Sequence, residues 1–324
     1  MTTSLLVCAR ALQFASGMIL VGVVAFRWII LLPALAGEAD ETWRNFSSLF
    51  RRLHILFIGS AILLVTSGVA MFWLVAADMS GLSLMDSLSA DTLGTVFFQT
   101  QFGTVCQWRL GFALVLGIAL CWLLRSRWLA RQKSTPLEWL AGILSAALFV
   151  SLAWTGHAAS TGGSVVRLTA DALHLLATTI WPTGLLFFAL FLRCARRHPD
   201  ISSLRPVIAA VQRFSNTSFI IVFALIVTGI CNSCFTVGSF SALVTTDYGR
   251  LLSLKLFLFL VILIIAALNR YRLVPLLRQS AKEPNSPRFP TTLKSLQGFV
   301  STEVSVALAI VLVVSILGKT PPAR

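Results

Sequence analysis

The chain is poor in charged residues. Only 12% of its 324 residues are charged, whereas a soluble domain carries about 25%. Hydrophobic residues make up 57% of the sequence, which excludes an ordinary soluble protein. Only helices and closed barrels satisfy their backbone in lipid, and long continuous apolar runs fit helices. The composition therefore predicts an all-α integral membrane protein.

Acidic residues are scarcer than basic ones, with 12 Asp+Glu against 26 Lys+Arg and a net charge of +14. The connections between apolar runs alternate between basic ones and ones nearly free of Lys and Arg, so the basic ones are expected inside and both termini outside. This bias accounts for most of the net charge and argues against nucleic acid as a partner. The bundle is expected to have about eight transmembrane helices, each run long enough to cross a bilayer, at about 8–32, 55–77, 105–124, 137–155, 171–192, 215–237, 250–268 and 297–317.

Several other features are missing. No connection is long enough for a soluble domain, so residues 1–324 are expected to form a single polytopic membrane domain. No internal repeat is evident, and no glycine-rich nucleotide-binding loop points to an ATP-driven pump. The six cysteines are scattered and form no disulfide framework. No nucleophile has a plausible base, so the protein is not expected to be an enzyme.

Three polar residues gather where the fourth and fifth runs meet outside. His157 follows the fourth run, and Asp171 and His174 open the fifth. Asp171 and His174 are spaced i, i+3 and share one helical face. Three interpretations remain open: Asp171 in the first turn caps the helix beside interfacial histidines, the three residues bind a metal such as copper or zinc, or the histidines bind haem.

Sulfur-containing residues also fall in the outer halves of the runs. Cys231 and Cys234 form a C-x-x-C pattern in the sixth run, and Met71 lies in the second. Thiolate, thioether and imidazole are the ligands that select Cu(I), so these residues are candidate accessory ligands. A lone cysteine in an apolar helix is more often a small packing residue.

Charged residues inside the runs are expensive in lipid and are usually paired or functional. Arg10 and Arg109 lie in outer halves, where we expect them to bind Asp171 or lipid phosphate, or to extend toward the membrane surface. Arg27 is expected to extend to the inner surface in the same way. The remaining intramembrane charges are Lys255, Glu303 and His54. Glu303 and His54 are both expected on the inner side, where they form an inner relay or an exit site, or where a single helix–helix hydrogen bond accounts for the buried polar group.

Several segments, in order, resemble the bacterial copper resistance protein D family. They are "FQTQFG" from Phe98, "GHA" from Gly156, "ADALHLLATTIWPTGL" from Ala170, "YGRLLSLKLFL" from Tyr248 and "NRYRLVPLLR" from Asn269. The resemblance implies an inner-membrane protein that moves copper or supplies it to partners, so that "outside" is the periplasm. It places His157 and His174 at family histidine positions. Pro182 departs from the family pattern, in which a small or apolar residue is common.

The resemblance makes copper import or delivery from a periplasmic-side His/Asp site the favoured function. A haem-binding transmembrane electron-transfer protein is one alternative. A membrane scaffold that docks a periplasmic copper chaperone is another, since the acidic segment 78–104 is long enough for a docking surface. Copper, a periplasmic copper-binding protein and the lipid bilayer are the expected ligand and partners.

Overall fold

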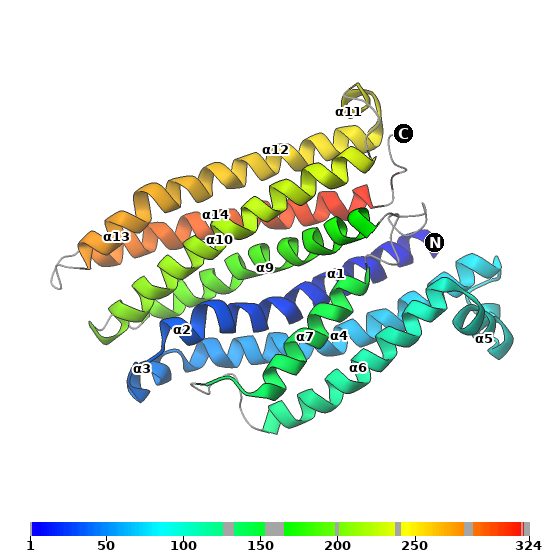
Figure 1. The fold of residues 1–324 in the computed structure, drawn as a ribbon, viewed down its shortest axis with the longest axis horizontal. Coiled ribbons are helices and arrows are strands. Elements are labelled where there is room, and N and C mark those ends of the chain that lie inside the picture. The colour runs from blue at the N-terminus through cyan, green and yellow to red at the C-terminus, as the bar shows by residue number, and fades with distance from the viewer. Residues whose placement is uncertain are drawn as a thin grey trace. The chain divides into compact units, whose positions relative to one another are not determined.

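The computed structural model describes residues 2–125, 133–152, 165–197, 201–236, 241–281, 288–318 and 320. Its regular elements in these residues are all helices (Figure 1). By its internal packing the chain divides into two compact units. Unit 1 comprises Met1–Val24 and His54–Thr179, and unit 2 comprises Ala25–Leu53 and Ile180–Arg324.

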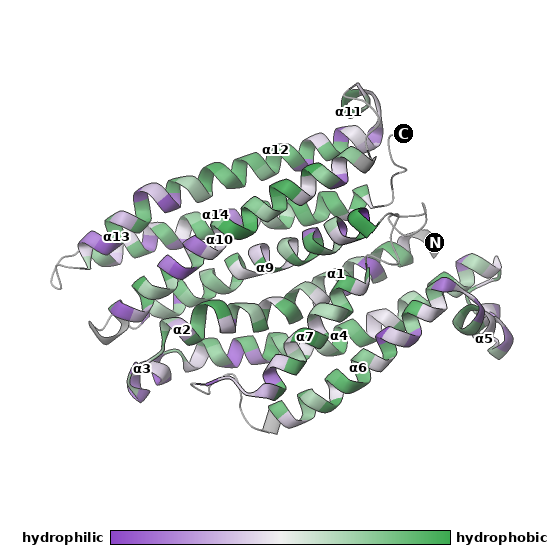
Figure 2. Cartoon of the chain, viewed as in Figure 1, coloured by the Kyte–Doolittle hydropathy of each residue, from purple (hydrophilic) through white to green (hydrophobic). Residues whose placement is uncertain are grey.

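Apolar helices confirm the all-helical membrane fold. Figure 2 shows that the middles of the long helices are mostly apolar. In the described part, seven segments are long and apolar enough to cross a membrane: Ser4–Ala34, Ser47–Ser80, Gln101–Leu123, Val165–Ala195, Leu204–Cys234, Asp247–Ser280 and Arg288–Leu317. The fourth expected span, 137–155, corresponds to a shorter apolar helix, Pro136–Val150. The count of eight spans, the single domain and the outside termini remain predictions.

Unit 1 contains a small aromatic-centred core. Phe149 is 1% exposed and packs with Val21 and Leu152, and its ring meets Phe14 edge to face with 5.9 Å between centroids. Gly17 allows this contact, because a Cβ there would lie 2.6 Å from the Phe149 ring. The elements are most of α1 (Thr2–Phe26), most of α4 (Ser47–Ser80), η2 (Asp86–Leu88), α5 (Ala90–Gln99), α6 (Gln101–Arg125), α7 (Pro136–Val150) and the first part of α9 (Val165–Ala195).

Unit 2 is held by stacked phenylalanines and by a long helix pair. Phe188 stacks on Phe214 at 4.3 Å and Phe46 on Phe191 at 5.0 Å between centroids. Helix α12 packs along α14 over much of its length (Figure 1). Besides the ends of α1 and α9, the elements are η1 (Arg27–Leu31), α2 (Leu32–Ala34), α3 (Asp40–Asn45), the start of α4, α10 (Ile201–Thr236), α11 (Ala242–Thr245), α12 (Asp247–Leu268), η5 (Asn269–Leu273), α13 (Val274–Ser280) and α14 (Arg288–Leu317).

The last two spans are longer than their apolar runs. Helix α14 begins at Arg288 rather than near 297, and α12, η5 and α13 form one helical segment through Ser280 rather than ending near 268. Hydropathy marks only the apolar part of a helix, whereas the hydrogen-bonded backbone continues into polar residues. Glu303 therefore lies midway along α14, not close to its inner end.

Helix α6 begins with a tight threonine–glycine turn. The Thr100 hydroxyl donates to the Val96 carbonyl oxygen at 2.7 Å and accepts from the Gly103 amide at 2.9 Å. A Cβ at Gly103 would lie only 2.2 Å from that same Val96 oxygen. The short helix α5 can therefore fold back on the start of α6 only because residue 103 is glycine.

Helix α12 begins in the same way. The Thr246 hydroxyl donates to the Ala242 carbonyl oxygen at 2.6 Å and accepts from the Gly249 amide at 3.0 Å. A Cβ at Gly249 would lie 2.0 Å from the Ala242 oxygen. In both helices a cation follows at the same distance, with Arg109 in α6 and Lys255 in α12. This local repeat was not recognised from the sequence, because so few residues carry it.

Candidate functional site

Two of the three predicted metal-binding residues lie on α9. Asp171 and His174 are one turn apart and both are half-buried, while His157 lies outside the described residues. Helix α9 begins at Val165, and its first turn contains no acidic residue. The expectation that Asp171 caps this helix is therefore wrong, because Asp171 lies beyond the first turn, where no backbone N–H group remains to be capped.

The region around His174 has a counterpart in α1. Residues 9–13 read Ala-Arg-Ala-Leu-Gln, and residues 170–174 read Ala-Asp-Ala-Leu-His. The first alanine is buried in both. Gln13 takes the place of His174 in this match; it is 5% exposed, and a Cβ at Gly68 of α4 would lie 3.4 Å from its Nε2. The position in α1 that matches His174 therefore faces a neighbouring helix.

The predicted sulfur ligands lie on two helices, α10 and α4. Cys231 and Cys234 lie on α10, one half-buried and one exposed, and both are free thiols. Met71 is half-buried on α4. In the described ranges no group of three or more His, Cys, Asp or Glu side chains is placed to hold a metal ion. The six metal-ligand assignments, including His157 as a further ligand beside His174, remain predictions.

The hydrogen bonds of Arg109 go to α7 in unit 1 rather than to Asp171, which was one of its expected partners. Its guanidinium donates to the Ser151 hydroxyl at 2.8 Å and to the Leu148 carbonyl oxygen at 3.3 Å. These groups lie at the carboxyl end of α7, where carbonyl oxygens lack helical partners and a cation is favoured. Arg10, by contrast, is exposed near the start of α1.

The position of Arg27 also differs from the expected one. Instead of extending to the membrane surface, it is fully buried, with 0% exposure. It is the first residue of η1, a π-helical segment in which the Leu32 amide donates to the Arg27 carbonyl oxygen. Such π-helical turns are rare and often occur at functional sites.

Glu303 forms a helix–helix hydrogen bond within unit 2. It is 3% exposed and accepts from Nδ2 of Asn269. This confirms the helix–helix hydrogen-bond alternative for Glu303. His54 and Lys255 are half-buried on α4 and α12, and the relay between His54 and Glu303 stays a prediction. Sequence analysis missed Asn269, because it lies just beyond the apolar run.

Comparison with known proteins matches both parts of the chain. Residues 1–168 match the copper resistance protein D-like N-terminal domain, and residues 208–317 match copper resistance protein D. The chain belongs to the copper resistance protein D family. Residues 169–207, which include Asp171 and His174, lie between the two matched ranges. Glu303 and Asn269 lie inside the second one.

Curated relatives of this copper resistance protein D family member come from three bacteria. Inner membrane protein YebZ of Escherichia coli is 29% identical over 229 residues, which cover 69% of this chain and 70% of the relative. Copper resistance protein D of Pseudomonas syringae is 28% identical over the same lengths and shares. Copper transport protein CutJ of Bacillus subtilis is 32% identical over 136 residues, 42% of this chain and 24% of that protein. No solved structure matches the chain.

A further buried carboxylate was missed from the sequence. Glu138 is 0% exposed in the first turn of α7. The Thr135 hydroxyl accepts from the Glu138 amide at 3.4 Å and donates to its carboxylate at 3.3 Å. The pattern Thr-Pro-Leu-Glu before an apolar run is a capping-box signature and was readable in the sequence.

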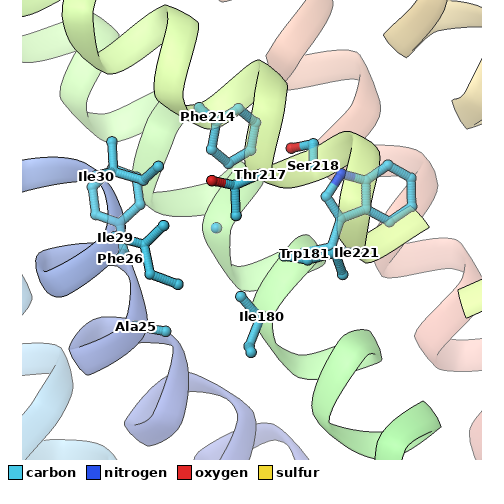
Figure 3. A pocket seen from close by; sticks show the side chains of 11 residues that line it. Ala25, Phe26, Ile29, Ile30, Ile180, Trp181, Phe214, Thr217, Ser218 and Ile221 are labelled. Atoms are coloured by element: carbon cyan, nitrogen blue, oxygen red, sulfur yellow. The ribbon is translucent and has the colours of Figure 1, made fainter. Parts of the chain in front are cut away.

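A small cavity in unit 2 is lined by none of the predicted metal ligands. Figure 3 shows it between the end of α1 with η1, the middle of α9 and α10. Its polar side-chain groups are the hydroxyls of Thr217 and Ser218 and the indole of Trp181, and no His, Cys, Asp, Glu or Met lines it. A soft metal ion would find no suitable ligand there.

Proposed function

We propose that this protein moves copper across the bacterial inner membrane, or delivers it there, from an outer site formed by His157, Asp171 and His174. The match of both parts of the chain to the copper resistance protein D family is the observation that carries this proposal. The names of two relatives, a copper transport protein and an inner membrane protein, support copper transport and an inner-membrane location.

The placement of Asp171 and His174 supports the outer site. Both lie on one face beyond the first turn of α9, so neither is needed to complete the helix end. Imidazole nitrogen and carboxylate oxygen together suit a first-row metal ion, and His157 would supply a second imidazole. Met71, Cys231 and Cys234 are further ligands that copper can meet along its path.

A periplasmic copper-binding protein is the proposed partner, docking on the end of α4, η2 and α5. The side chains of Met79 and Met85 are 55% and 76% exposed. The carboxylates of Asp86 and Asp91 are exposed nearby in sequence. Thioethers can exchange Cu(I), and an acidic surface favours a basic partner.

The test is copper uptake into proteoliposomes that contain the full chain. We expect uptake by the wild type and loss of most of it in the variant His157→Ala/His174→Ala. His198→Ala is the matched control, because it removes a histidine that has no place in the proposed site. Equal uptake by all three proteins would contradict the proposal. A Soret band in the purified protein would instead favour a haem-binding electron-transfer protein.

A further inference from the structure

The packing face of α14 carries one charged residue among apolar ones. The buried residues of this helix are Leu293, Leu296, Val300, Glu303, Ala307, Val313 and Leu317. Glu303 lies midway along the helix, far from either end, so no free backbone N–H group or helix-end dipole stabilises its charge. A carboxylate at this depth is costly, and such residues in membrane helices usually mark ion or proton sites.

Asn269 is the hydrogen-bonding partner of Glu303, and it lies at an irregular point of the neighbouring helix. It is the first residue of η5, where the Val274 amide donates to the Asn269 carbonyl oxygen across a π-helical turn. The Asn269 side chain is 7% exposed, and its Nδ2 donates to Oε1 of Glu303. Its Oδ1 is buried and has no hydrogen-bond partner among the described residues.

The unpartnered oxygen is what a proton-binding pair requires. An ionised carboxylate can accept one bond from a primary amide, but it has no proton to give to the amide oxygen. A protonated carboxyl can accept from Nδ2 and also donate its O–H to Oδ1, which forms a cyclic pair. Asn269 is therefore able to hydrogen-bond Glu303 in both protonation states. A purely structural hydrogen bond needs no ionisable group at this position.

The charged groups on the elements that pack against α14 have other partners, are exposed or lie at a distance along the helix. Arg196, just beyond the end of α9, donates to Oε1 of Gln297 on α14 at 2.6 Å, and Gln297 precedes Glu303 by about 9 Å along the helix. Arg270 of η5 donates to the Ser215 carbonyl oxygen and hydroxyl at 2.7 and 2.8 Å, away from α14. Arg272 of η5 and Arg278 of α13 are exposed. On α12, Lys255 precedes Asn269 by nearly four turns, about 20 Å along the helix, and Asp247 and Arg250 lie farther still, in an exposed i, i+3 pair. On α14 itself, Lys294 is exposed.

We propose that Glu303 and Asn269 form a proton-binding site in the membrane, and that copper movement is coupled to it. An O–H bond forms at Glu303 when a proton arrives from water on one side, and the same bond breaks when that proton leaves to the other side. Release of a proton balances the charge of a copper ion that passes the other way. The coupling rests on the proposed copper function, whereas proton binding does not.

Difference infrared spectroscopy tests proton binding without copper. The full-length protein in lipid is titrated with acid, and the carbonyl stretch of protonated carboxyl groups is followed in H2O and D2O. Among the carboxyl bands of the chain's 12 Asp and Glu residues, we expect one titrating band that is lost in Glu303→Gln and kept in Glu138→Gln, the matched control on the other buried glutamate. Asn269→Leu should move the band to higher wavenumber, because the acid loses its hydrogen bonds to the amide. A spectrum unchanged in Glu303→Gln would overturn the site.

Copper uptake at different pH values tests the coupling. Wild-type and Glu138→Gln proteoliposomes should show uptake that changes by up to about tenfold per pH unit over the titration range of the band. Glu303→Gln should show uptake that is flat over this range. The same pH dependence in Glu303→Gln would overturn the coupling. If the wild type takes up no copper, the proposed function and its coupling fail, and the infrared result still decides whether Glu303 binds a proton.

Discussion

The two units each bury a glutamate in a helix, and the two positions differ. Glu138 in unit 1 lies in the first turn of α7 and shares a capping box with Thr135. Glu303 in unit 2 lies midway along α14 and has a hydrogen bond from Asn269. Both side chains are almost completely buried. Burial alone therefore does not separate the two residues, but their position along the helix does.

The difference shows which buried carboxylate has a structural role. In the first turn of a helix, free backbone N–H groups and the helix dipole stabilise a carboxylate, and its side chain completes the cap. In the middle of a helix none of these is present, so the charge is stabilised by few groups. The first position is therefore expected to support folding, and the second to support proton transfer.

The largest expected effect on stability is at the threonine–glycine turns, one of which lies in each unit. Gly103→Val and Gly249→Val force a Cβ against a backbone carbonyl oxygen, at 2.2 and 2.0 Å in the present geometry. We expect each to lower the free energy of unfolding by about 3 kcal/mol, the upper range for overpacking. Thermal unfolding in detergent would measure it. Gly111→Ala in α6, which meets nothing within 4 Å, is the control, and equal stability of all these variants would break the comparison.

The next largest effect on stability is expected at Arg109 in unit 1. Arg109→Met removes two hydrogen bonds from a charged donor to the end of α7, and we expect a loss of about 2 kcal/mol. Arg109→Lys should lose less, because it keeps the charge near the helix end. Thermal unfolding of the two variants beside the wild type gives the ranking. A stability of Arg109→Met equal to that of the wild type would mean that this contact does not hold α7.

A smaller effect is expected at the cap of α7. Thr135→Ala removes the side chain that accepts from the Glu138 amide, and caps of this kind contribute about 1 kcal/mol. Thr135→Ser keeps the hydroxyl and should restore most of the stability. Unfolding curves of both variants would show this, and an unchanged midpoint for Thr135→Ala would contradict a structural role for this end of α7.

The smallest effect on stability is expected for the two isosteric changes. Glu138→Gln keeps a capping box, since glutamine also occupies that position in such boxes. Glu303→Gln keeps an oxygen that can accept from Asn269 Nδ2. Each should change the free energy of unfolding by less than about 1 kcal/mol. A large loss of stability in Glu303→Gln alone would show that its charge has a structural role.

Much of the fold could be predicted from the sequence, because apolar runs of sufficient length identify membrane helices. The predicted run 171–192 lies within α9, yet the helix begins at Val165. Hydropathy does not detect a helix end made of polar residues, and so Asp171 was wrongly assigned to the first turn. For the same reason Asn269 was placed outside a helix that continues through Ser280.

The sequence identified candidate residues by their type, but it did not predict their hydrogen-bonding partners. Glu303 stands out in the sequence as a charge in an apolar run, whereas its partner Asn269 depends on how α12 packs along α14. For Arg109, Asp171 was one of the expected partners because opposite charges attract, and the structure shows hydrogen bonds to the end of α7. Helix ends carry partial charges that a list of charged residues does not show.

The most direct test of copper handling at the outer site is the copper content of the purified full-length protein after incubation with Cu(I) and removal of free metal. The wild type and His198→Ala are expected to retain close to equimolar copper, and His157→Ala/His174→Ala to lose it. Copper retained equally by all three proteins would contradict the assignment of the site. Copper absent from the wild type would contradict copper binding by this chain.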